Sequence, residues 1–238
     1  MYRTILSVML AATMTLFSAM TVARAGETPV VVELFTSQGC SSCPPADAYL
    51  GQLAEREDVI ALSLHVDYWD YLGWRDVFGS AGHTKRQRRY AKVIGERMIY
   101  TPQVIINGRE GMVGSRQNQV AEAIARHSAQ PAAAEIELSL NGDRLVADIT
   151  PLLENSGGHV FLCWFKRAET VNIRAGENHG RNITYHNVVQ GWSDMGEWRG
   201  MRIAMTAPKP MDADGVAVMI QPAKGGPIMA AARLWLIE

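Results

Sequence analysis

The fold is decided by residues 29–45, which read Pro-Val-Val-Val-Glu-Leu-Phe-Thr-Ser-Gln-Gly-Cys-Ser-Ser-Cys-Pro-Pro. Residues 29–35 are mostly β-branched and apolar, as expected for a buried strand. Thr36 to Gly39 are typical of a turn, and a helix is predicted from Cys43 to Arg56, with both prolines in its first turn. The two cysteines therefore stand where a buried strand is followed by a helix.

Outward from this stretch, the apolar pattern predicts a strand-helix-strand unit, then a second helix, a hairpin and a last helix. The second strand is expected at Val59–Val66, parallel to the first, with a right-handed crossover between them. Thr84 and Gln87 have capping-box spacing, which predicts that the second helix begins near Thr84. The remaining expected elements are strands at Gln103–Asn107 and Gly111–Gly114, a turn at Asn107-Gly108, and a helix over residues 115–127.

After Pro131 the pattern changes to strict alternation, which predicts an all-β region. Residues 136–140 and 145–149 alternate between apolar and polar, with Asn141-Gly142 between them, as in a hairpin. Further strands are expected at Val160–Phe165, Ile183–Val189, Trp198–Ala204, Val216–Gln221 and Ile228–Ile237. About 100 residues of this kind favour an antiparallel β-sandwich.

The first 25 residues have the parts of a secretory signal peptide. Arg3 supplies a positive charge, an apolar stretch runs from Ile5 to Met20, and Ala23-Arg24-Ala25 provides a small-x-small cleavage signal. An uncleaved anchor is the alternative, although the stretch is short for a membrane span. We therefore expect a periplasmic or secreted protein with no stable membrane span after cleavage.

The composition is that of a globular protein. The chain has 238 residues, of which 47% are hydrophobic and 20% charged, enough for a sizeable core. Its formal net charge of -1 offers no basic excess, so we expect no nucleic-acid partner. Three cysteines are too few to hold a fold together as a disulfide scaffold.

The chemistry of the chain is expected at Cys40-Ser41-Ser42-Cys43. Two cysteines three residues apart at a helix start can close a small disulfide. The helix dipole and the free N–H groups favour a thiolate there, and the thiolate is the attacking species in disulfide exchange. We expect Cys40 to be the exposed nucleophile and Cys43 the buried resolving thiol. A structural disulfide or half of a zinc site are the alternatives, but the sequence has no second Cys-x-x-Cys.

Thr101-Pro102 supports the redox interpretation. A cis peptide bond almost always precedes a proline, and Pro102 stands at the start of a strand, where proline is tolerated. With a cis bond here, Thr101 could pair with a substrate peptide through its backbone. An ordinary trans proline at a strand edge is the alternative.

Residues 30–43 and 100–114 resemble the thioredoxin superfamily, in which a cis-proline loop faces the disulfide. More closely, residues 33–47, 65–70, 100–103 and 176–188 together resemble a bacterial secreted family, domain of unknown function 1223. This resemblance covers nearly all of the chain after residue 25.

The resemblance implies a thioredoxin-like α/β domain at residues 26–130, after the signal peptide at residues 1–25, and a β-sandwich domain at residues 131–238. It implies no reaction, because the family carries none that can be transferred. In the better-known relatives a buried acid stands six residues before the nucleophile, whereas Glu33 stands seven residues before Cys40.

Glu33 therefore has two interpretations. A carboxylate is costly to bury in an apolar strand, so it either relays a proton to Cys43 or pairs with a basic side chain. The loop after Val66 holds Tyr68, Trp69 and Trp74, which are candidates for contact with a substrate. Packing of these aromatic side chains against the β region is the alternative.

Three further features are open. His65 could join Cys40 and Cys43 in a copper site, as in some copper-delivering thioredoxin-like proteins, or be a hydrogen-bonded core histidine. Residues 85–89 form a basic run that we expect to be a solvated helix face, and Cys163 is expected to be a buried structural thiol. Residues 177–182 are either a binding loop of the second domain or a loop held by side-chain hydrogen bonds.

We thus expect an exported thiol–disulfide oxidoreductase that acts on protein thiols, together with a redox partner and without a cofactor. The alternatives are a non-catalytic binding module with a structural disulfide, and a copper-handling protein.

Overall fold

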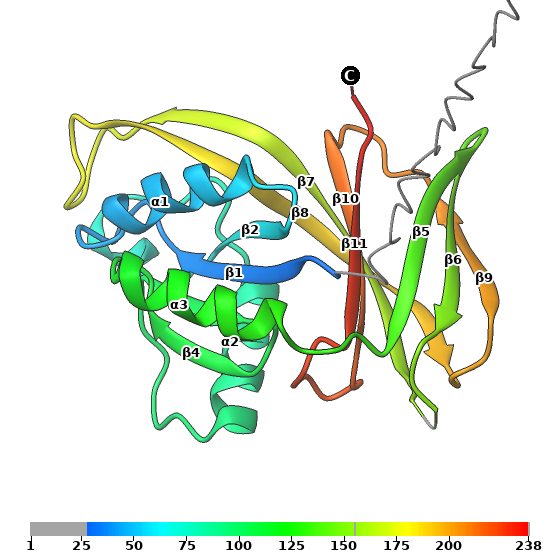
Figure 1. Ribbon diagram of the computed structural model, residues 1–238. Coiled ribbons are helices and arrows are strands. Elements are labelled where there is room, and N and C mark those ends of the chain that lie inside the picture. The colour runs from blue at the N-terminus through cyan, green and yellow to red at the C-terminus, as the bar shows by residue number, and fades with distance from the viewer. Residues whose placement is uncertain (1–27, 155, 238) are drawn as a thin grey trace, which may run out of the picture.

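The computed structural model describes residues 28–154 and 156–237. These residues form a mixed α/β fold with one large mixed sheet and one small antiparallel sheet (Figure 1). The expected signal peptide at residues 1–25 lies outside the described residues. Within the described part of the chain, no helix is long and apolar enough to cross a membrane.

The first half follows the expected order of strands and helices. Its elements are β1 (Val30–Thr36), α1 (Pro44–Ala54), β2 (Val59–His65), the short 3-10 helix η1 (Asp70–Leu72), α2 (Ala81–Ile94), β3 (Gln103–Ile106), β4 (Glu110–Val113) and α3 (Gln117–Ser128). As predicted, β1 pairs parallel with β2. On its other side, β1 pairs antiparallel with β3, and β3 continues into β4 through the Asn107-Gly108 hairpin.

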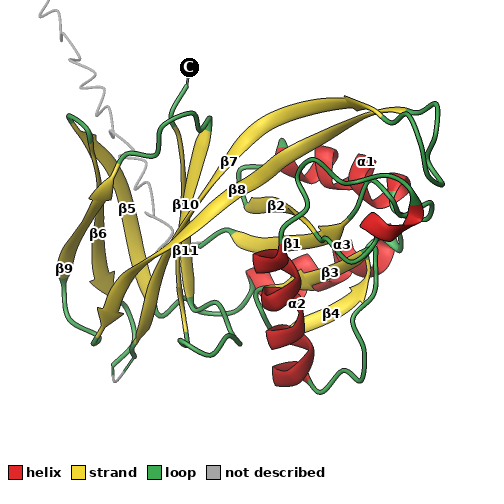
Figure 2. Ribbon diagram, turned by 180° about the vertical axis from the view of Figure 1, so that it is seen from behind, coloured by secondary structure: helices red, strands yellow, loops and turns green. Residues whose placement is uncertain are grey.

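Helices cover both faces of this part of the sheet (Figures 1 and 2). Val30, Val32 and Leu34 of β1 pack on the face that carries α1 and α3. Val31 and Phe35 point the other way and pack with Tyr90 of α2. Strand β1 is therefore buried on both faces, which is why it reads as a continuous apolar run.

The second half is all-β, as the alternation predicted. Its strands are β5 (Ala134–Asn141), β6 (Arg144–Pro151), β7 (Gly158–Asn172), β8 (Asn182–Trp198), β9 (Ile203–Pro208), β10 (Gly215–Gln221) and β11 (Ala230–Trp235). The predicted strand at Trp198–Ala204 is wrong. β8 ends at Trp198 and β9 begins at Ile203, because the chain turns at Gly200, whose φ is 72°.

The two halves share one sheet. Its strand order is β11-β10-β7-β8-β2-β1-β3-β4, with β2 and β8 joined at Ser63 and Val188. The separate sheet β5-β6-β9 packs against the part of the large sheet that the second half of the chain forms. Leu145, Ile149 and Leu162 lie in the core between these two sheets. The expected division near residue 130 falls between α3 and β5, but β7, β8, β10 and β11 extend the sheet of the first half rather than stand apart from it.

Two expectations about α2 are wrong. The helix begins at Ala81, and the Ser80 hydroxyl caps it by accepting from the Gly82 N–H at 3.1 Å. Thr84 does not cap the helix, because its hydroxyl donates to Asp67 at 2.6 Å. The basic run is also not a fully solvated face, since Arg86 is 6% exposed and Gln87 is buried.

Candidate functional site

Cys40 and Cys43 form a disulfide at the start of α1, as the spacing predicted. The pair lies between the end of β1 and a helix that has prolines in its first turn. The Cys43 carbonyl accepts the first helical hydrogen bonds, from Ala46 N at 2.8 Å and from Asp47 N at 3.1 Å. Cys43 thus lies at the end of the helix where the dipole favours a negatively charged sulfur.

Cys40 is buried, so the prediction of an exposed nucleophile is wrong for this conformation. Cys40 is 4% exposed and Cys43 is fully buried, whereas Ser41 and Ser42 are exposed. The loop between β7 and β8, residues 173–181, contacts the backbone around Cys40.

That loop reaches the disulfide from the far end of the sequence. The Asn178 amide donates to the Gln38 carbonyl at 3.0 Å and to the Cys40 carbonyl at 2.9 Å. A carboxylate oxygen of Glu177 accepts from the Ser41 N–H at 3.2 Å. The β7–β8 hairpin carries this loop over α1 (Figure 1). The sequence left the role of residues 177–182 open, and the structure shows side-chain hydrogen bonds from Glu177 and Asn178 to the cysteine motif. We call residues 173–181 the covering loop.

The Thr101–Pro102 peptide bond is cis, as expected. Trp69 ties this loop to the cysteine motif. Its indole Nε1 donates to Thr101 Oγ1 at 2.7 Å. The Cβ of Trp69 lies 3.2 Å from the position that a Cβ on Gly39 would occupy. Gly39 directly precedes Cys40, so Trp69 contacts both sides of the site.

The other two predicted aromatic contacts are also half-buried and use their polar atoms internally. Tyr68 donates to Gln87 at 3.3 Å, and Trp74 donates to Gln38 at 2.8 Å. Trp74 also packs against Gly176 of the covering loop. The sequence singled out neither Gln38 nor the best exposed aromatic residue, Tyr71, which is 77% exposed and stacks on Trp69 with ring centroids 6.3 Å apart.

A group of buried polar side chains lies on the α1 side of the sheet, beneath the disulfide. Asp47 is 2% exposed and accepts from the Thr36 hydroxyl at 2.7 Å. Burial raises the pKa of Asp47 to about 7, although the charge of His65 and the Thr36 hydrogen bond oppose the rise. Asp47 stands one helical turn after Cys43, so the two side chains share a helix face.

His65 is bound to a second carboxylate. Its Nδ1 lies 2.7 Å from Asp76 Oδ2, and Asp76 also accepts from the Gln38 and Phe78 N–H groups at 2.8 and 2.9 Å. Burial alone would raise the pKa of Asp76, but the charge of His65 and these hydrogen bonds hold it below its usual value. The sequence singled out neither Asp47 nor Asp76 for this role.

Glu33 pairs with a basic side chain, which is one of its two interpretations, and it lies on the face of β1 opposite α1. Arg86 Nε donates to Glu33 Oε1 at 2.5 Å, and the Tyr90 hydroxyl donates to the other carboxylate oxygen. The reason is strand alternation. Glu33 points to the α2 face with Val31 and Phe35, while the helix that carries Cys43 packs on the opposite face.

The copper interpretation finds no support in the geometry. Within residues 28–154 and 156–237, no three His, Cys, Asp or Glu side chains are grouped so that they could hold a metal ion, so Cys40, Cys43 and His65 do not form a ligand set. Cys163 is the buried thiol that the sequence predicted, and burial raises its pKa to about 12. It stays a thiol at neutral pH and is inert in exchange.

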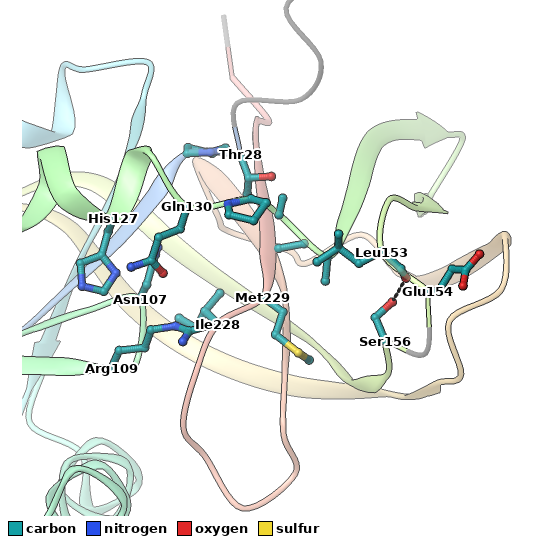
Figure 3. Close-up of a pocket in the computed structure, with 15 residues that line it drawn as sticks. Thr28, Asn107, Arg109, His127, Gln130, Leu153, Glu154, Ser156, Ile228 and Met229 are labelled. Carbon is teal, nitrogen blue, oxygen red and sulfur yellow. Dashed lines mark hydrogen bonds between the residues drawn. The ribbon is translucent and has the colours of Figure 1, made fainter.

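A separate pocket of about 310 Å³ lies where the linker after α3 meets the turn before β11 (Figure 3). His127, Asn107 and Arg109 line one side of it, and Leu153 and Met229 line the other. No predicted site residue lies in this lining, so the pocket and the cysteine site are distinct.

Comparison with known proteins identifies a family but no activity. The family model described as "Protein of unknown function (DUF1223)" matches residues 31–221. A structural genomics target from Agrobacterium tumefaciens is 34% identical, with a TM-score of 0.78 over 89% of this chain and 96% of that one. HBP35 of Porphyromonas gingivalis is 15% identical, with a TM-score of 0.53 over 88% of this chain and 75% of that one, and is similar in fold alone. No curated protein matches the chain.

Proposed function

Since the chain belongs to the DUF1223 family, which brings no reaction with it, we propose from the site itself that the protein is an exported thiol–disulfide oxidoreductase acting on protein thiols. The observation that carries this proposal is the Cys40–Cys43 disulfide at a helix start, linked through Trp69 to a cis Thr101–Pro102 bond. Its reacting partners would be a protein dithiol and a second redox protein.

A thioredoxin-like fold for residues 26–130 is part of the proposal. Its support is the element order β1-α1-β2-α2-β3-β4-α3 and the strand order β2-β1-β3-β4 within the sheet. The disulfide follows the first strand and the cis-proline opens the third, as the resemblance to the superfamily implies.

The exchange begins at Cys40. A substrate thiolate attacks Cys40 Sγ, the Cys40–Cys43 bond breaks, and Cys43 leaves as a thiolate that needs a proton. A second substrate thiolate then attacks the substrate sulfur of the mixed disulfide and releases Cys40. The substrate dithiol is oxidised and the protein disulfide is reduced, and exchange with the redox partner runs the same steps in reverse.

Asp47 is suited to supply the proton to Cys43. Its carboxyl is buried on the same helix face, and a pKa of about 7 leaves it partly protonated at neutral pH. In this protein the buried acid therefore comes from α1. The strand position six residues before Cys40 is Leu34, which is apolar.

The test is disulfide exchange between the mature protein, residues 26–238, and a dithiol peptide. The Cys43→Ser variant, mixed with the disulfide form of the same peptide, should accumulate a mixed disulfide on Cys40, because the Cys40 thiolate attacks the peptide disulfide and no second thiol releases it. Cys163→Ser should behave as the wild type because that thiol is buried. Cleavage after Ala25 is checked by N-terminal sequencing of protein from the periplasmic fraction. Absence of exchange with intact folding would contradict the oxidoreductase proposal.

A non-catalytic binding module remains the second proposal, because one observation favours it. Cys40 is 4% exposed beneath Asn178 and Glu177. If this cover does not open, the disulfide is structural, and it should resist reduction by dithiothreitol in the folded protein.

A further inference from the structure

Three side chains beneath the disulfide each keep one polar atom without a partner. They are His65 through Nε2, Asp47 through Oδ2 and Tyr185 through its hydroxyl oxygen. All three residues are at least 98% buried. An orphaned polar atom is costly inside a protein, so three of them in one place point to a missing partner.

These atoms belong to one place in the fold. Thr36 bonds Asp47 at 2.7 Å and is the register partner of His65 on the neighbouring strand. The Tyr185 ring lies 4.6 Å from the His65 ring, centroid to centroid, at 78°. The Phe78 ring packs edge-on against both of these rings. The three side chains therefore come from elements that contact one another, Asp47 from α1, His65 from β2 and Tyr185 from β8.

Hydrogen-bond chemistry defines the missing partner. Asp76 is ionised and can only accept, so His65 Nδ1 carries the hydrogen of their 2.7 Å contact. His65 Nε2 is then an acceptor in the neutral ring and a donor in the charged ring. Asp47 Oδ2 and the Tyr185 hydroxyl complete a set of three groups that one water, with two donors and two acceptor sites, can satisfy.

We propose that one buried water joins Asp47 Oδ2, His65 Nε2 and the Tyr185 hydroxyl, and that this network positions the Asp47 carboxyl and the proton it carries. The use of this proton rests on the proposed function. When the disulfide breaks, the proton leaves Asp47 for Cys43 Sγ, and it returns when the disulfide forms again. His65 and Tyr185 act as positioning residues for Asp47.

The charged and titratable groups around His65 are consistent with this assignment. They are Asp76 from the loop after β2, Asp47 from α1, Tyr185 from β8, and His83 with Arg86 from α2. Burial lowers the pKa of His83 to about 4, so this ring is neutral near pH 7 and does not compete for the proton. Burial also raises the pKa of Tyr185, which keeps its hydroxyl protonated.

The experiment measures the equilibrium between the protein disulfide and dithiothreitol from pH 5 to pH 9. The wild type should show an inflection near pH 7 from the proton on Asp47. His65→Gln removes the positive charge that lowers the pKa of Asp47 and should move the inflection up by about one pH unit. Tyr185→Phe should move it in the same direction by less. His127→Gln, a buried histidine beside Glu110 on another element, is the matched control and should leave the inflection in place.

One result would overturn the proposal. If Asp47→Asn removes the inflection but His65→Gln and Tyr185→Phe both leave it unchanged, then Asp47 titrates alone. A second measurement covers variants that fold poorly. In the wild type, NMR should show magnetisation transfer from a long-lived water to the Tyr185 ring, and its absence would also contradict the proposal. A protein that shows the inflection but no exchange with protein thiols would count against the proposed function alone.

Discussion

Asp47 owes its unusual titration to its position on α1. A carboxylate in the first turn of an exposed helix interacts favourably with the dipole, and its pKa falls. Asp47 instead faces the sheet, is 2% exposed, and has one hydroxyl partner, Thr36. The loss of hydration outweighs the Thr36 hydrogen bond and the charge of His65, both of which favour the carboxylate. The pKa of Asp47 therefore rises to about 7.

Asp47→Asn should make the protein more stable above neutral pH. The folded state binds a proton at Asp47 up to about pH 7, whereas the unfolded chain releases it near 3.8. Wild-type stability should therefore fall as the pH rises from 4 through 7, by about 3–4 kcal/mol if the whole shift is expressed. Asn keeps an acceptor for Thr36 and carries no charge, so this pH dependence should disappear.

Urea unfolding at pH 4, 6 and 8 measures this effect. Asp58→Asn is the control, because Asp58 is exposed beside Arg56 and its pKa is lowered. Asp58 changes the pH dependence of stability only below pH 4. The change in the free energy of unfolding from pH 4 to pH 8 should therefore be the same in Asp58→Asn as in the wild type. An Asp47→Asn variant with the wild-type slope would show that Asp47 is already ionised in the folded protein at pH 4.

Glu33→Gln should destabilise the protein without affecting disulfide chemistry. It leaves Arg86 buried without its counter-charge, and breaking one side of a buried ion pair costs about 3–5 kcal/mol. The double variant Glu33→Gln/Arg86→Met should recover part of the loss, since no charge is then left unpaired. Denaturant unfolding measures the stability.

The pH profile of disulfide reduction separates Glu33 from Asp47. Glu33 lies on the opposite face of β1 from α1, so Glu33→Gln should leave the profile unchanged. A profile altered by Glu33→Gln and not by Asp47→Asn would reverse the roles given to these two carboxylates.

At the level of residues, the sequence predicted the features that depend on spacing along the chain. It missed the features that depend on the direction in which a side chain points. Cys40, Cys43 and Pro102 were found because each marks a junction between elements. Asp47 stands four residues after Cys43, but nothing local says whether a first-turn carboxylate faces solvent or the sheet. Glu33 was left with two interpretations because its strand is apolar on both faces. In such a strand the sequence does not indicate which helix a side chain points toward.

At the level of elements, the β7–β8 hairpin brings a distant segment of the chain into contact with the cysteine motif. Its loop makes two hydrogen bonds through Asn178 and one through Glu177 to the backbone around Cys40. No local pattern in the sequence predicts such a contact, because it joins residues 138 positions apart.

Asn178→Ala should increase the rate at which dithiothreitol reduces the disulfide. Loss of two hydrogen bonds of about 1 kcal/mol each favours opening of the loop by roughly tenfold or more. The rate is followed by quenching with an alkylating reagent and mass spectrometry. His179→Ala is the matched control, since His179 is the exposed neighbour of Asn178. Equal rates in wild type and Asn178→Ala would show that the loop does not limit access.

Helix α2 shows the same limit of local patterns. Arg86 stands in a basic run and was expected on a solvated face, yet it packs over the Trp192 ring at 4.2 Å and pairs with Glu33. Thr84 and Gln87 have the spacing of a cap, but their side chains bind Asp67 and Tyr100 instead. In both cases tertiary partners decide the role of the residue.

At the level of the whole molecule, one core crosses the expected boundary near residue 130. Val31, Phe35 and Tyr90 from the first half pack with Cys163, Phe165 and Met219 from the second. The sequence predicted an α/β first half and an all-β second half. It did not predict the pairing of β2 with β8, because an apolar strand does not indicate which strand lies beside it.

Residues 26–130 alone should therefore fail to fold cooperatively. The fragment would expose the α2 face of β2 and lose the strand that pairs with it. Circular dichroism during heating should show one cooperative transition for residues 26–238 and none for the fragment. A fragment with its own sharp transition would establish two independent folding units.

The covering loop has a consequence for the order of events during synthesis. The chain is made from the N-terminus, so Cys40 and Cys43 are complete long before Glu177 and Asn178 exist. Throughout that interval the hydrogen bonds of Glu177 and Asn178 with the cysteine motif cannot form. The nascent protein is thus most open to oxidants and to other thiols before its last third is made, and closure of the hairpin ends that period.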